Sequence, residues 1–216
     1  MPSNPLLLLA VAVSALLAIR AHIGPDKRWQ IYILKPLTTA LILALAVLTP
    51  STDPRYHLAV CVGLALSLAG DIFLMLPGDR FLPGLASFLL AHLAYLGAFT
   101  SGLPVAPAVA PLVVYGAAGA AMLAALWPGL SHRLRAPVAT YVLVIATMAA
   151  VALARWLDRG GSLALAAAVG AGLFMLSDAL LALGRFRRSF PGARAAVLGT
   201  YWAAQLLIAV SVGGAV

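Results

Sequence analysis

Eight long runs of apolar residues fill most of this 216-residue chain. A helix needs about 20 apolar residues to cross the hydrocarbon core of a bilayer, and each run is roughly that long. The predicted spans are residues 5–21, 31–48, 57–76, 82–100, 105–127, 136–154, 162–184 and 195–214. The segments between them are short and contain turn-forming or charged residues, so neighbouring helices should pack antiparallel. We therefore predict an all-α bundle of about eight transmembrane helices, which forms a single transmembrane domain over residues 1–216.

The scarcity of charge supports this class. Charged residues make up only 9% of the chain, whereas a soluble domain has about 25%. A water-soluble enzyme is therefore excluded, and the single cysteine, Cys61, excludes a disulfide scaffold. Unalternating runs of this length argue against a membrane β-barrel. We interpret the net charge of +8 as loops that face an anionic membrane surface and the cytoplasm, with no nucleic-acid partner.

The basic residues are divided unequally between the two sides of the predicted bundle. The loops after the first, third, fifth and seventh spans hold ten Lys and Arg residues, and the opposite loops hold three. Because basic loops stay in the cytoplasm, both termini should face outward from a bacterial-type inner membrane that the chain crosses many times. Tryptophans near the predicted span ends are expected in the interfacial belts: Trp29, Trp127, Trp156 and Trp202.

A weak internal repeat relates the two halves of the sequence. Lys35-Pro36 near the start of the second span matches Ala136-Pro137 near the start of the sixth. Asp71 in the third span matches Asp178 in the seventh, with sequence offsets of 101 and 107. These matches predict two related four-helix halves with the same orientation in the membrane. Chance similarity between apolar helices is the alternative.

Few ionisable residues lie inside the predicted spans. Each costs at least about 2.5–3.5 kcal/mol at the centre of a bilayer, so each is a candidate for function. By helical rise, Lys35, Asp71 and Asp178 all fall within the cytoplasmic third of the bundle. We predict that they meet polar residues of neighbouring helices in one pocket. Asp71 and Asp178 are the candidate catalytic residues, and the candidate binding residues are Lys35, Thr39, Ser67, His92, Tyr95, Ser177, Tyr201 and Gln205.

The charges of these residues indicate a mechanism. Lys35 can neutralise one aspartate, and the other has no cationic partner at its depth unless His92 is protonated. In an apolar site, a carboxyl beside another carboxylate tends to keep its proton at neutral pH. One protonated and one ionised carboxyl can perform acid–base cleavage of an acetal-like or enol-ether bond.

Structural roles are the competing interpretation of the same residues. Asp71 and Asp178 could each pair with Lys35 or with an arginine of an adjacent loop, Arg80 or Arg185. Lys35 alone could extend its ammonium group to the membrane interface.

His92 has a structural and a metal-binding interpretation as well. With Tyr95, it could form hydrogen bonds between helices. It could also form a metal site with Asp71 and Asp178, although no tight ligand spacing supports such a site. We therefore expect no metal and no cofactor.

Five motifs from the second to the eighth span occur in a characteristic order. They are Lys35-Pro36 with Thr38-Thr39, Ser67-x-x-Gly70-Asp71 with Leu74-Met75, Phe81 through Phe88-x-x-x-His92-x-x-Tyr95, Gly172-x-Phe174-x-x-Ser177-Asp178, and Tyr201-Trp202-x-x-Gln205-x-Leu207-Ile208. With these five motifs in this order, the chain resembles the YhhN-like lysoplasmalogenase family of polytopic membrane proteins. The resemblance implies an eight-helix hydrolase that cleaves the vinyl ether bond of lysoplasmalogens, lysophospholipids that it would take from among the membrane lipids. The products would be a fatty aldehyde and glycerophosphocholine or glycerophosphoethanolamine.

The resemblance agrees with the mechanism inferred from the charges. A neutral aspartate would protonate the β-carbon of the vinyl ether, and an ionised one would stabilise the resulting cation and activate water. Lys35 and the basic loops would hold the phosphate of the headgroup. Which of Asp71 and Asp178 plays which part stays open, and a related ether lysolipid could replace the lysoplasmalogen. The alternative function is a small-solute transporter or lipid translocator that uses the same polar residues.

Overall fold

The computed structural model describes residues 4–23, 28–101 and 109–214 of the chain. Within these ranges the chain forms eight α-helices, as predicted, and two short 3-10 turns, Trp127–Gly129 and Ser211–Gly214. The helices are α1 (Pro5–Ile23), α2 (Arg28–Leu48), α3 (Pro54–Met75), α4 (Phe81–Thr100), α5 (Val109–Leu126), α6 (His132–Arg159), α7 (Ser162–Phe186) and α8 (Ala193–Val210).

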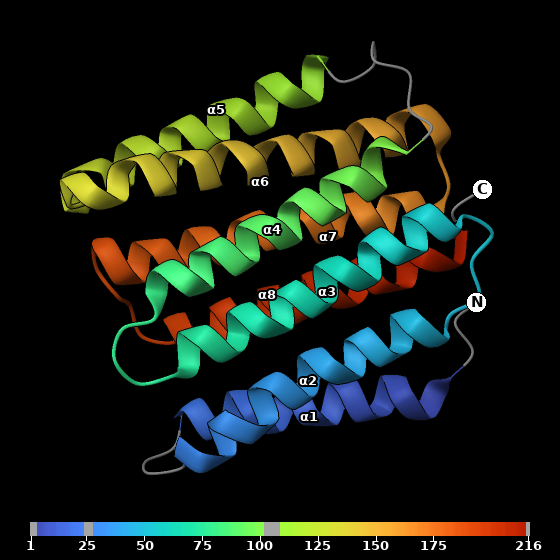
Figure 1. Ribbon diagram of the computed structural model, residues 1–216, viewed down its shortest axis with the longest axis horizontal. Coiled ribbons are helices and arrows are strands. Elements are labelled where there is room, and N and C mark those ends of the chain that lie inside the picture. Colours follow the sequence, from blue (N-terminus) through green and yellow to red (C-terminus); the bar gives the residue numbers. More distant parts are fainter. Residues whose placement is uncertain (1–3, 24–27, 102–108, 215–216) are drawn as a thin grey trace.

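The helices lie roughly along one common direction (Figure 1). At the centre, α3 packs against α4 and α7 packs against α8. On one side, α2 lies against α3 and α8 and carries α1; on the other, α6 lies against α4 and α7 and carries α5. α1 begins and α8 ends at the same end of the bundle, as the predicted even number of crossings requires. That this end faces outward stays a prediction.

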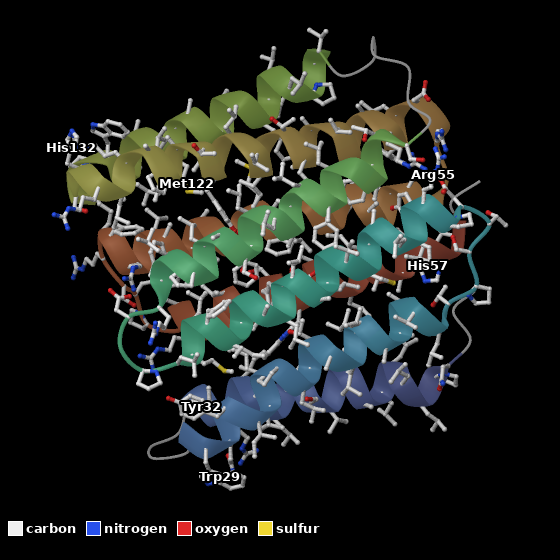
Figure 2. The ribbon with its side chains drawn as sticks, viewed as in Figure 1. Trp29, Tyr32, Arg55, His57, Met122 and His132 are labelled. Atoms are coloured by element: carbon white, nitrogen blue, oxygen red, sulfur yellow. The ribbon has the colours of Figure 1, made fainter. Side chains whose placement is uncertain are left out.

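Seven helices, α2 to α8, are long and apolar enough to cross a membrane by length and composition. The apolar stretch of α1 that the structure describes, Pro5–Ala21, is shorter. The expected eight helices are therefore confirmed for the described residues, while the candidate spans among them number seven. Polar and aromatic side chains mark the two ends: Trp29, Tyr32 and His132 lie at one end, and Arg55 and His57 at the other (Figure 2).

Five helices, α2, α3, α4, α6 and α8, begin earlier than predicted, and α2 and α6 thereby gain a basic first segment. α2 begins at Arg28 and α6 at His132, so Pro36 and Pro137 lie inside helices. The prediction rests on the apolar runs, but each helix extends beyond its run into a basic first segment. A proline inside a membrane helix is tolerated because neighbouring helices and local adjustments satisfy the freed backbone groups. The first residues of the predicted fifth span, 105–108, lie outside the described residues.

The start of α3 is fixed by a capping aspartate. The carboxylate of Asp53 accepts hydrogen bonds from the backbone N–H groups of Arg55 and Tyr56, both at 3.0 Å, and from the hydroxyl of Ser101 at 3.1 Å. The hydrogen bond from Tyr56 is the main cause that holds the pKa of Asp53 below the ordinary value of an aspartate. This contribution to stability is therefore present above that ordinary value and is lost as the pH falls through the lower pKa of the folded protein.

Glycines bring α3 and α4 close together. A Cβ atom built on Gly63 would overlap the ring of Tyr95, and one built on Gly70 would come within 2.7 Å of the ring of Phe88. Small residues at such positions allow close packing of membrane helices.

We expect Gly70→Ala to destabilise the folded protein by about 1–3 kcal/mol, because the new methyl group overpacks the contact with Phe88. Gly97→Ala is the matched control, since nothing lies within 4 Å of a Cβ atom at that position. The control should leave stability unchanged or raise it slightly, as Gly-to-Ala changes in helices usually do. Thermal unfolding of the purified variants in detergent measures the difference in stability. Equal melting temperatures would show that the close contact between Gly70 and Phe88 does not contribute to stability.

Candidate active site

The carboxylate of Asp71 joins three helices. Lys35 Nζ on α2 lies 3.1 Å from Asp71 Oδ1. The hydroxyls of Thr39 and Tyr201 donate to Oδ2 at 2.7 and 2.8 Å, and the indole N–H of Trp202 donates to Thr39 Oγ1 at 3.3 Å. The side chain of Asp71 is 2% exposed. We call these five residues the Asp71 centre; its one carboxylate is compensated by one ammonium group.

The sequence places these groups by helical spacing. Lys35 and Thr39 are four residues apart on α2 and therefore lie on one face, which is turned toward α3. Tyr201 and Trp202 are adjacent on α8 and reach the same centre from its other side. Both carboxylate oxygens of Asp71 have partners, as a buried charge requires.

The carboxyl of Asp178 on α7 has a different environment. The hydroxyl of Tyr141 on α6 donates to its Oδ2 at 2.5 Å, and Nε2 of His92 on α4 lies 3.8 Å from the same oxygen. His92 is completely buried, with its ring edge-on to those of Tyr141 and Phe174 at 5.1 and 4.6 Å. Among the described residues, no lysine or arginine forms an ion pair with Asp178. We call Asp178, Tyr141 and His92 the Asp178 centre.

Aromatic rings connect the two centres. The ring of Phe174 packs against His92 on one side and against Tyr201, at 5.4 Å between centroids, on the other. Phe88 packs against both Phe174 and Tyr201, at 6.2 and 5.9 Å. Six of the predicted residues thus lie at two neighbouring centres with rings between them, Lys35, Thr39, Asp71 and Tyr201 at one and His92 and Asp178 at the other, whereas the sequence predicts one pocket.

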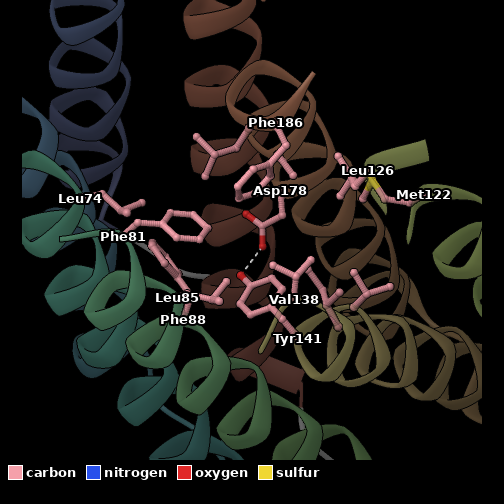
Figure 3. A pocket seen from close by; sticks show the side chains of 14 residues that line it. Leu74, Phe81, Leu85, Phe88, Met122, Leu126, Val138, Tyr141, Asp178 and Phe186 are labelled. Carbon is pink, nitrogen blue, oxygen red and sulfur yellow. Dashed lines mark hydrogen bonds between the residues drawn. The ribbon is translucent and has the colours of Figure 1, made fainter. Parts of the chain in front are cut away.

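Asp178, but not Asp71, lines an apolar slot of about 50 Å³ (Figure 3). In the figure, Asp178 and Tyr141 lie at the middle of the slot, with Leu74 and Phe81 toward one end and Met122 and Leu126 toward the other. Slot residues come from α3 to α7, and α5 and α6 form the end that contains Met122.

A larger cavity of about 590 Å³ lies next to the slot. Its lining residues come from α2, α3, α4, α7 and α8 and from the segment between α7 and α8, and they include three cations: Lys35, Arg185 and Arg194. We call it the basic cavity. The slot and the basic cavity share the side chains of Leu74, Phe81 and Leu181 as a common wall.

Among the eight predicted binding residues only Lys35 lines one of these two cavities, and four of the others, Ser67, Tyr95, Ser177 and Gln205, also belong to neither centre. The hydroxyl of Tyr95 donates to Gln205 Oε1 at 2.7 Å and links α4 to α8. Ser177 Oγ donates to the backbone carbonyl of Val197 at 2.9 Å and links α7 to α8. Ser67 is completely buried on α3, one turn before Asp71. The hydrogen bonds of Tyr95 and Ser177 correspond to the structural interpretation.

The ion pairs decide between the pairings that the sequence leaves open. Asp71 pairs with Lys35, not with Arg80, and Arg185 pairs with Asp79, with Nη2 at 2.7 and 3.0 Å from the two carboxylate oxygens. For a metal ion, no group of three His, Cys, Asp or Glu side chains with suitable placement occurs in the part of the chain that the structure describes.

Sequence reasoning missed Tyr141 and misplaced Trp202. The sixth span supplied no candidate residue, although a tyrosine well inside an apolar span needs a hydrogen-bond partner when buried and could have been noticed for that reason. Trp202, expected at the membrane interface, is 3% exposed and belongs to the Asp71 centre. Its position near the start of the span was the misleading signal.

Comparison with known proteins gives consistent results. The model of the YhhN family matches residues 30–212. The chain is 34% identical to the uncharacterized membrane protein YhhN of Escherichia coli O157:H7, over 93% of this chain and 95% of that protein. It is 40% identical to the lysoplasmalogenase TMEM86B of Sus scrofa, over 79% and 71%, and 33% identical to a lysoplasmalogenase of Mycobacterium bovis, over 81% and 67%. No solved structure matches the chain significantly.

Proposed function

Because this chain belongs to the YhhN family of membrane proteins, we propose that it hydrolyses the vinyl ether bond of lysoplasmalogens or of a related ether lysolipid. The products are a fatty aldehyde and the glycerophospho-headgroup. The relatives from pig and Mycobacterium bovis, which are named lysoplasmalogenases, support the reaction class and a lysophospholipid substrate. The chain is a multi-pass membrane protein, and its relative in E. coli is named a membrane protein, so this chain would meet such a substrate in the bilayer.

The observation that carries the proposal is the common wall between two unlike cavities. The basic cavity suits a phosphate, and the small apolar slot suits only a short hydrocarbon segment of the lipid. Asp178 lines the slot, and Phe81, which lines both cavities, contacts the cation Arg185 of the basic cavity. In a lysoplasmalogen only the glycerol separates the phosphate from the vinyl ether, so a lipid that spans the wall places its vinyl ether beside Asp178.

We assign the proton donor to Asp178. It lies in an apolar slot without a lysine or arginine partner, which favours a carboxyl that carries a proton. The hydroxyl of Tyr141 engages Oδ2, so Oδ1 is the oxygen that delivers the proton. Once the proton has left, the hydrogen bond from Tyr141 stabilises the carboxylate.

The reaction then follows from this assignment. Asp178 protonates the β-carbon of the vinyl ether, and the C=C bond becomes an oxocarbenium ion at the α-carbon. Water attacks the α-carbon and returns a proton to the Asp178 carboxylate. The resulting hemiacetal breaks its bond to the glycerol oxygen, which takes up the hydroxyl proton, and releases the aldehyde. Asp71 acts as a positioning residue in this scheme, because it holds the ammonium group of Lys35 at the wall of the basic cavity.

The test is aldehyde release by the purified protein in detergent. We expect one aldehyde and one glycerophospho-headgroup for each 1-alkenyl lysophospholipid consumed, and no product from the matched 1-alkyl lipid, which has no C=C bond to protonate. In D₂O the aldehyde should carry one deuterium on the carbon next to the carbonyl, with authentic aldehyde in D₂O as the exchange control. Lack of aldehyde would refute the proposal, and lipid movement across sealed liposomes without chemical change would favour a translocator.

A further inference from the structure

We propose that the basic cavity recognises the phosphate of the headgroup and no other part of it. The enzyme therefore accepts ether lysolipids with purely anionic headgroups, such as a phosphate monoester, at least as well as the choline and ethanolamine forms. This inference rests on the proposed function, since it names the substrate class for the same site. It follows from the charges that line the cavity.

The three cations of the cavity differ in whether an acidic side chain forms an ion pair with them. Lys35 is paired with Asp71 and Arg185 with Asp79, so each of these pairs is neutral. Arg194, in the first turn of α8, has no acidic partner among the ion pairs of the described residues. The cavity therefore keeps a net positive charge, and it is large enough for a ligand, since ligand pockets measure about 300–1,000 Å³.

No group in the cavity wall suits a cationic headgroup. The chain contains no glutamate, and no aspartate is among the described residues that line the cavity. The carboxylate of Asp71 is enclosed behind Lys35, and that of Asp79 is engaged by Arg185. Quaternary ammonium groups are bound by cages of several aromatic rings, whereas the wall offers the exposed ring of Tyr32 and that of Phe81.

Phe81 is already occupied by a cation of the protein. The guanidinium carbon of Arg185 lies 4.2 Å from the centroid of the Phe81 ring and 5.8 Å from that of Phe186. This contact, together with the ion pair to Asp79, holds Arg185 at the common wall between cavity and slot. A phosphate in the cavity would have the donors of Lys35, Arg185 and Arg194 around it, since all three line the cavity, while a choline or ethanolamine group would extend into the remaining space.

The test uses saturated 1-alkyl lysolipids, which bind without being cleaved. Phosphate monoester, ethanolamine and choline forms of one chain length are compared as inhibitors of aldehyde release and as ligands that raise the melting temperature. We expect the monoester to bind at least as tightly as the other two, and these two to differ by less than about threefold. Arg194→Gln should weaken all three by about tenfold, with the largest loss for the monoester.

Arg133→Gln is the matched control. Arg133 is exposed near the start of α6, at the same end of the bundle, and does not line the cavity. Inorganic phosphate and glycerol 3-phosphate distinguish a free anion from a lipid: we expect them to compete only at far higher concentrations than the monoester lipid. If they compete equally well, the assignment to a lipid headgroup is wrong.

Two further outcomes would overturn the inference: zwitterionic lipids that bind more than about tenfold tighter than the monoester, or equal losses from Arg194→Gln and Arg133→Gln. The melting-temperature measurement does not require catalysis. A protein that binds these lipids with the expected order but releases no aldehyde would therefore refute the proposed function and leave the headgroup inference standing.

Discussion

Asp178→Asn is expected to reduce aldehyde release by about 10²–10⁴-fold, which is the contribution typical of a general acid. The amide keeps the shape of the side chain and an oxygen that accepts the hydrogen bond from Tyr141. It cannot deliver a proton to carbon, so the loss should appear in kcat with little change in KM or melting temperature. The measurement is steady-state aldehyde release by purified wild type and variant at equal folded concentration.

Ser177→Ala is the control for Asp178→Asn. Ser177 precedes Asp178 on α7, but its hydroxyl donates to the backbone carbonyl of Val197 on α8. Loss of this hydrogen bond should lower the stability of the folded protein by about 1 kcal/mol and leave kcat within a fewfold of wild type.

Tyr141→Phe should have a kcat between those of Ser177→Ala and Asp178→Asn, because it removes the hydrogen-bond donor to Asp178 but keeps the acid itself. Full activity of Asp178→Asn would show that the proton comes from another group.

Asp71→Asn is expected to destabilise the fold by about 3 kcal/mol, because it leaves the Lys35 ammonium without its counterion in a largely buried site. The amide oxygen can still accept from Thr39 or Tyr201, so the effect reports mainly the lost charge. In the double variant Lys35→Met with Asp71→Asn, no uncompensated charge remains and most of the stability should return. Thermal or denaturant unfolding in detergent measures both.

The same double variant separates positioning from catalysis. If Asp71 only positions Lys35, the double variant should bind substrate more weakly but keep kcat within about tenfold of wild type. A drop in kcat comparable to that of Asp178→Asn would instead make Asp71 a second catalytic carboxyl. Failure of the double variant to recover stability would contradict the view that the ion pair dominates the energetics of the Asp71 centre.

The class of fold could be predicted from the sequence because a bilayer imposes one strong requirement: about 20 apolar residues for each crossing. The runs that meet it are helices in the described part of the chain. The ends of α2 and α6 could not be read in the same way, because their basic first segments are helical without being apolar. The internal repeat stays a prediction. Asp71 contacts groups on α2 and α8, and Asp178 contacts groups on α6 and α4. In a repeat of two four-helix halves, α2 corresponds to α6 and α4 to α8, so each aspartate would contact one helix of its own half and one of the other half.

The sequence leads to a prediction of the depth of the site, which stays a prediction, but not of how its helices are rotated about their axes. Helical rise predicts similar depths for Lys35, Asp71 and Asp178. In the structure Lys35 forms an ion pair with Asp71, which is one of the pairings that the charges suggest. The side of α7 that carries Asp178 faces α6, which depends on how the helices pack around one another. Sequence periodicity is weak in helices that are apolar on all sides, so neither Tyr141 nor the slot could be derived from it.

The common wall of Leu74, Phe81 and Leu181 has a consequence for what happens after the bond breaks. The proposed cleavage would divide an amphiphile into a water-soluble part and an oily part, and each part would already be on its own side of the wall. The headgroup would then leave through the basic cavity. The aldehyde would be left against α5, the least buried of the seven candidate spans, from which it would dissolve directly into the bilayer. Accumulation of one product would then inhibit turnover independently of the other.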